Sequence, residues 1–149
     1  FAFPEIIAAR CPMDYWQRVQ RAHEQAGLTI LEGECQGWVS LAPVKERDIT
    51  ILSSNVADGA RCIYRIWRCL ARYVTRNFSL AAIPSPGYFP ANDDCPRRFA
   101  QWPRVVWRFV DRGDPDVRHA DIGTMELFGS PVVANDPYVV AQFLREQGS

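Results

Sequence analysis

The sequence lacks most of the short motifs that identify a chemistry. Its 149 residues contain no GxGxxG, no GxxxxGK and no GxSxG stretch, so nucleotide binding and serine hydrolysis have no motif to support them. His23 and Glu24 do not extend to the HExxH zinc motif, because position 27 is glycine. The five cysteines are an odd number without CxxC spacing, which fits neither a disulfide framework nor a zinc site. We therefore expect no cofactor, reduced thiols and a cytoplasmic protein.

A long apolar run is also missing. No stretch approaches the roughly 20 consecutive apolar residues of a membrane-spanning helix, so we expect a soluble protein with no membrane partner. The chain starts at Phe1 rather than at a methionine, and we interpret residues 1–12 as an N-terminal extension ahead of Met13. The hydrophobic fraction of 48% is enough for one packed core, which predicts a single domain over residues 13–149.

Lysine is nearly absent, since Lys45 is the only lysine among 17 basic residues. Arginine favours bidentate contacts with phosphate or carboxylate, although the codon usage of a GC-rich genome would produce the same composition. The net charge is zero, but residues 61–112 hold ten basic and three acidic side chains while both flanks are acidic. Such an asymmetry indicates where an anionic partner would bind.

Helix signals occur in three places. Asp14 can cap a first helix that Gly27 would stop. Asn55 or Asp58 can cap a long helix that we expect to continue to about Phe78. Pro137 occupies the favoured first-turn position of a final helix.

Strand signals lie between these helices. Short β-branched and apolar segments predict strands at 28–31, 37–42, 48–54 and 105–110, with a further strand or extended pair at 124–133. Residues 81–103 hold so many prolines that we expect a loop there. The predicted fold is a single α+β domain with a mainly antiparallel sheet of four to five strands. A long central helix and N- and C-terminal helices would pack on one face of that sheet.

An arginine stripe marks the long predicted helix. Arginines spaced by four, three, four and four residues fall within an arc of about 80° on a helix that turns about 100° per residue. They are Arg61, Arg65, Arg68, Arg72 and Arg76. Two interpretations remain open: a face that is solvated or paired with the protein's own acids, and a surface for an anionic partner.

A second basic group follows, and it is interleaved with aromatic residues. Its arginines are Arg97, Arg98, Arg104, Arg108 and Arg112, and the aromatic residues between them are Phe99, Trp102, Trp107 and Phe109. Guanidinium and aromatic groups in alternation suit single-stranded nucleic acid. The alternative is that Trp107 and Phe109 belong to the core, with Arg104 and Arg108 on the opposite strand face.

An acidic segment near the end of this region could hold a divalent metal or orient a histidine as a base. Its members are Asp111, Asp114, Asp116, His119 and Asp121, but they match no known calcium spacing. An ordinary polar surface loop explains them equally well.

The function that these patterns favour is a small, non-enzymatic binding protein. We expect an accessory protein of bacterial type, such as an inhibitor, immunity protein or adaptor, whose arginines contact an acidic protein or a nucleic acid. The alternative is a metal-assisted enzyme with its site in residues 111–121. A structural component of a larger assembly is a third possibility.

Overall fold

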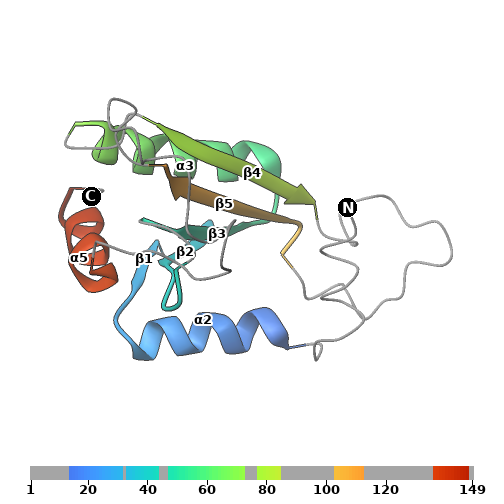
Figure 1. Cartoon of the computed structure of the whole chain (residues 1–149). Helices are drawn as coiled ribbons and strands as arrows, with labels where there is room; N and C mark the ends of the chain where they lie inside the picture. The colour runs from blue at the N-terminus through green and yellow to red at the C-terminus, as the bar shows by residue number, and fades with distance from the viewer. Residues whose placement is uncertain are drawn as a thin grey trace, which may run out of the picture.

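The computed structural model describes residues 14–31, 33–43, 47–72, 77–84, 103–112 and 136–147, which contain three helices and five strands (Figure 1). The elements are α2 (Tyr15–Gln25), β1 (Thr29–Leu31), β2 (Cys35–Val39), β3 (Ile49–Ser53), α3 (Val56–Ala71), β4 (Phe78–Pro84), β5 (Val105–Asp111) and α5 (Pro137–Gln147). All neighbouring strands are antiparallel, in the order β1-β2-β3-β5-β4. The predicted α+β class with an antiparallel sheet is therefore confirmed.

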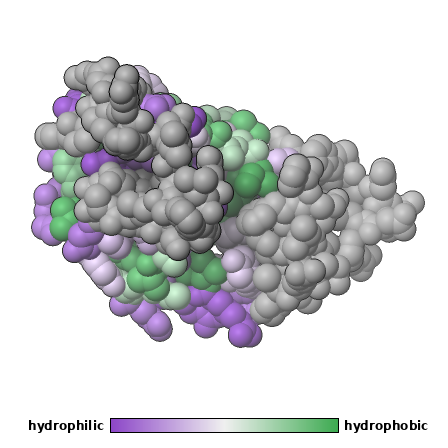
Figure 2. Space-filling model, viewed as in Figure 1, coloured by the Kyte–Doolittle hydropathy of each residue, from purple (hydrophilic) through white to green (hydrophobic). Residues whose placement is uncertain are grey.

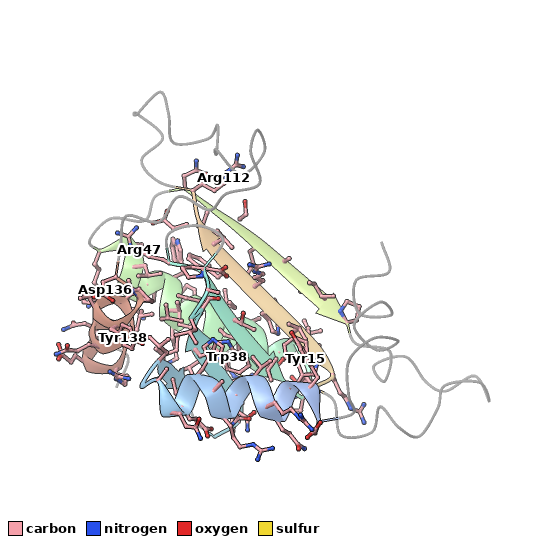
Figure 3. The ribbon with its side chains drawn as sticks, turned by 60° about the horizontal axis from the view of Figure 1, so that its bottom comes forward. Tyr15, Trp38, Arg47, Arg112, Asp136 and Tyr138 are labelled. Carbon is pink, nitrogen blue, oxygen red and sulfur yellow. The ribbon has the colours of Figure 1, made fainter. Side chains whose placement is uncertain are left out.

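The helices lie on both faces of the sheet. α3 and α5 cover one face, where Ile63, Ile66 and Leu144 pack against the main core. α2 covers the other face, where Trp16 and Val19 pack beside Trp38 (Figures 1 and 3). The expectation that the helices share one face is wrong, because alternate residues of β2, β3 and β5 are buried on each side of the sheet.

The long helix is shorter than predicted. α3 ends at Ala71, and Phe78 begins β4 instead of ending the helix. Pairing with β5 outweighs the helical pattern here: β4 matches β5 at seven successive positions, and the ring of Phe78 stacks on Phe109 with centroids 4.9 Å apart. The first four residues of the predicted loop at 81–103 consequently belong to a strand, while 85–102 and the strand predicted at 124–133 lie outside the described residues.

The first turn of α3 is fixed by a short hydrogen-bond chain. The Asn55 side chain accepts from the backbone N–H of Asp58 at 2.9 Å, so Asn55 is the cap. Trp107 Nε1 donates to Ser53 Oγ at 2.9 Å, and Ser53 Oγ donates to the carbonyl oxygen of Asn55 at 2.8 Å. The helix thus approaches β5 closely, and a Cβ atom on Gly59 would overlap the Trp107 indole.

Candidate partner-binding surface

The outward face of α3 carries most of the predicted arginine stripe. We call Arg61, Tyr64, Arg65, Arg68 and Arg72 the α3 basic surface; all five are exposed. The opposite side of the helix holds Ile63, Ile66 and Leu70, each at most 6% exposed. The arginines therefore project from a helix whose backbone is held by the core. Arg76 lies outside the described residues.

Contacts of Arg61 and Arg68 organise side chains of this surface. Arg61 forms an ion pair with Asp58, one turn earlier on the same helix. The guanidinium carbon of Arg68 lies 5.8 Å from the centre of the Tyr64 ring, within the range of a cation–π contact. Tyr64 is 55% exposed even though its ring also lies 5.9 Å from that of Trp67. A large, half-exposed aromatic side chain therefore borders the arginines of α3 and contacts Arg68, a feature that the charge pattern alone did not predict.

Arg108 does not belong to the α3 basic surface. Its Nη2 and Nε atoms donate to the two carboxylate oxygens of Asp48 at 2.7 and 3.2 Å, and this contact raises the pKa of the arginine despite its partial burial. Asp48 is only 1% exposed. Trp107 and Phe109 are buried at 6% and 0%, so these two aromatic residues belong to the core. The core interpretation of this strand is confirmed.

Asp111 is likewise an internal residue rather than a loop ligand. It is the last residue of β5, is 1% exposed, and forms an ion pair with Arg47. The other proposed metal ligands, Asp114, Asp116, His119 and Asp121, lie outside the described residues, as do Arg97, Arg98 and Trp102. Within the described ranges, no three His, Cys, Asp or Glu side chains are grouped as a metal site would require.

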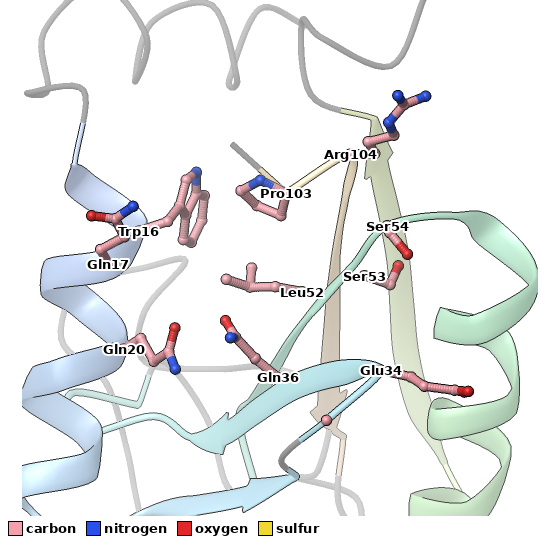
Figure 4. Close-up of a pocket in the computed structure, with 11 residues that line it drawn as sticks. Trp16, Gln17, Gln20, Glu34, Gln36, Leu52, Ser53, Ser54, Pro103 and Arg104 are labelled. Atoms are coloured by element: carbon pink, nitrogen blue, oxygen red, sulfur yellow. The ribbon is translucent and has the colours of Figure 1, made fainter. Parts of the chain in front are cut away.

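A pocket of about 350 Å³ opens between α2 and the ends of the strands (Figure 4). Trp16, Leu52 and Pro103 form its apolar part, and Gln20 and Gln36 supply carboxamides. Its lining also includes Glu34 and Arg104, but Figure 4 shows the Arg104 guanidinium pointing away from the centre. The part of the pocket between Trp16 and Leu52 thus offers an apolar surface with carboxamide groups for hydrogen bonding.

His23 has a structural role. Its Nδ1 lies 2.7 Å from the carbonyl oxygen of Val19, and its Nε2 accepts from the backbone N–H of Leu41 at 3.1 Å. The ring also stacks on Trp38 with a centroid distance of 5.1 Å. Since both ring nitrogens are engaged and the residue is 9% exposed, His23 connects α2 to the sheet and the loop after β2, as expected of a packed histidine.

Comparison with known proteins identifies no family for this chain. No protein-family model matches the chain, and no curated protein matches it significantly.

Among the helices that the structure describes, none combines the length and apolar content that crossing a bilayer requires.

Proposed function

We propose that the protein is a non-enzymatic, cytoplasmic binding protein whose α3 basic surface docks on an acidic face of another protein. The observation that carries this proposal is the exposed Tyr64 ring with Arg68 packed over it. Tyrosine and arginine, together with tryptophan, are enriched among the residues that dominate binding energy at protein interfaces. A large aromatic side chain held beside an arginine on the exposed side of a helix is more typical of a binding surface than of a face that is only solvated.

The helix also presents these groups at low entropic cost. α3 is anchored by Ile63, Ile66 and Leu70 in the core and by the Asn55 cap at its first turn. A rigid backbone leaves mainly side-chain freedom to be lost on binding. The exposed Ala60 and Ala71 lie on the same helix and leave room for a partner to approach.

An acidic protein fits this surface better than a nucleic acid does. Domains that bind nucleic acid usually carry a strong net positive charge, whereas this chain has 17 basic and 17 acidic residues. Arg61 is already paired with Asp58, and Arg108 is paired with Asp48. The positive charge of α3 is confined to one side of one helix, which suits a local acidic patch on a folded partner.

A comparison of two arginine pairs tests the proposal. Arg68→Ala with Arg72→Ala removes two charges from the α3 basic surface. Arg18→Ala with Arg21→Ala removes two charges from exposed positions of α2, on the other face of the sheet. The two variants have the same net charge, so any difference between them reports position rather than overall electrostatics.

The assay is fluorescence anisotropy with a labelled polyglutamate peptide and, separately, with single- and double-stranded oligonucleotides. We expect the α3 variant to bind polyglutamate at least about tenfold more weakly, and the α2 variant to stay close to wild type. Equal losses in the two variants would contradict the proposal. Tighter binding of oligonucleotides than of polyglutamate, lost in the α3 variant, would make the partner a nucleic acid instead.

A metal-assisted enzyme remains the alternative, with Asp114, Asp116, His119 and Asp121 as its candidate ligands. Asp111 drops out of that set because it is buried against Arg47. Calorimetric titration with Mg²⁺, Mn²⁺, Ca²⁺ and Zn²⁺ tests this alternative. Binding that Asp114→Ala and Asp116→Ala abolish would favour it over the binding protein.

A further inference from the structure

The two edges of the sheet are built differently. β1, at one edge, has three residues, and its register with β2 is irregular between Thr29 and Leu31. α5 packs beside it, and Arg145 Nη1 donates to the carbonyl oxygens of Gly27 at 2.7 Å and Thr29 at 3.2 Å. A short, irregular strand with occupied carbonyl groups is a poor template for another strand.

β4, at the other edge, has none of these features. It is seven residues long and pairs with β5 in an uninterrupted register from Phe78 to Pro84. Its sequence, FSLAAIP, contains no charged residue, and Leu80 is 43% exposed. Figure 1 shows β4 as the outermost strand, and Figure 2 shows hydrophobic residues at the surface over this part of the sheet. Among the described strands, β4 has β5 as its one neighbour.

We propose that β4 pairs antiparallel with β4 of a second copy of this chain, which joins the two five-stranded sheets into one. A long, regular edge strand without charged side chains is the type that associates with another strand. The pairing leaves the described fold unchanged and adds hydrogen bonds along the side of β4 that faces away from β5.

The sequence of β4 is complementary to itself, which favours a second copy of this chain as the partner strand. Antiparallel pairing about the strand midpoint, Ala81, places Leu80 opposite Ala82 and Ser79 opposite Ile83, so that each larger side chain meets a smaller one. No like charges oppose each other, because the strand has none. Pro84 falls at the end of the pairing, where its missing N–H costs little. The result is a closed two-fold interface, the commonest form of homodimer.

The symmetry has a consequence for the α3 basic surface. A two-fold axis between antiparallel strands of one continuous sheet is perpendicular to that sheet. The two copies of α3 would therefore lie on the same face of the joined sheet, and both sets of arginines would point to the same side. The dimer itself does not depend on the proposed function, but it would make binding to an acidic partner bivalent.

Analytical ultracentrifugation of the full chain tests the proposal. We expect wild type to change from monomer to dimer over roughly a hundredfold range of concentration, as mass action requires. Leu80→Lys should raise the dimer dissociation constant at least about tenfold, because lysine on an edge strand opposes pairing. Leu41→Lys is the matched control, since Leu41 is an equally apolar side chain with 48% exposure outside the sheet. It should leave the dissociation constant unchanged.

A second variant, Ala81→Lys, places two lysines directly opposite each other at the two-fold axis, and it decides the question if Leu80→Lys fails to fold by circular dichroism. A wild-type monomer at every concentration would overturn the proposal. The proposal would also be overturned if wild type forms a dimer whose dissociation constant is the same in Leu80→Lys, Ala81→Lys and the Leu41→Lys control. Neither of these results bears on the polyglutamate assay, which compares the double arginine variants of α3 and α2.

Discussion

Gly59→Ala tests the packing that positions α3. In an ordinary helix interior, replacing glycine by alanine stabilises a protein by about 0.5–1 kcal/mol. Here a Cβ atom would overlap the indole of Trp107 and lie 2.7 Å from Ser53 Oγ. Both neighbours are buried, at 6% and 3% exposure, so neither can move into solvent.

Two costs oppose the gain in helix propensity. Overpacking of a buried site costs about 1–3 kcal/mol. Displacing the indole also disturbs the 2.9 Å hydrogen bond from Trp107 to Ser53, a bond worth about 1 kcal/mol. After subtraction of the propensity gain, we expect Gly59→Ala to lower the free energy of unfolding by about 1–3 kcal/mol. Urea unfolding followed by far-UV circular dichroism measures this quantity.

Two further variants isolate the cause. Ala60→Gly, at the next and exposed position of the helix, should cost about 1 kcal/mol through propensity alone. In a Trp107→Phe background the smaller ring leaves space, so Gly59→Ala should become nearly neutral. A Gly59→Ala protein more stable than wild type, or an effect of equal size with phenylalanine at 107, would refute the reasoning.

Three further predictions concern buried polar groups. His23→Phe keeps a ring stacked between α2 and the sheet but removes two hydrogen bonds, so it should lower the free energy of unfolding by about 1–3 kcal/mol in urea; an unchanged midpoint would contradict this role. Arg108→Ala removes the two hydrogen bonds that the Asp48 carboxylate, 1% exposed, accepts from the arginine, and should lower the free energy of unfolding by about 1–3 kcal/mol. Asp48→Ala should cost less in the same unfolding assay, because the side chain of Arg108 is 39% exposed and can reach water. A larger loss for Asp48→Ala than for Arg108→Ala would contradict this prediction. Burial, and then a hydrogen bond to Cys62, raises the pKa of Cys35 to about 12, so its thiol stays protonated at pH 9. Iodoacetamide at that pH should modify Cys62 before Cys35, as peptide mass spectrometry would show, and equal rates in the folded protein would argue against it.

The sequence predicted the elements whose signals are local. Gly27 follows the end of α2, and Asn55 caps α3. The prediction that Asp14 caps α2 is wrong, since its carboxylate makes no cap hydrogen bond and pairs with Arg18 instead. β4 was missed because its evidence is not local: FSLAAIP has a single β-branched residue, and the arginine spacing continues past Ala71 as if the helix did too. What makes this segment a strand is its pairing with β5, about 30 residues later, including the stacking of Phe78 on Phe109.

The two-sided burial of the sheet did leave a signal in the sequence. Val106 stands between Val105 and Trp107, and Leu52 follows Ile51, so both strand faces are apolar there. Continuous apolar strands indicate a sheet covered on both faces, whereas strict alternation indicates a sheet covered on one.

Part of the candidate site could be predicted and part could not. Helical periodicity placed Arg61, Arg65, Arg68 and Arg72 together on the exposed face of α3. Periodicity could not show that Arg108 would pair with Asp48, since the two residues are 60 positions apart. The arginine spacing gave no signal for Tyr64, because the tyrosine ring carries no charge.

Tyr64→Ala is the most direct test of the α3 basic surface, because it changes no charge. If that surface is a docking site, affinity for labelled polyglutamate should fall about tenfold, since the ring that positions Arg68 is gone. Tyr138→Ala is the matched control, with a tyrosine 49% exposed on α5, and it should bind as wild type does. If the two variants bind equally well, α3 attracts anions by charge alone, and the central claim of a built docking surface is wrong.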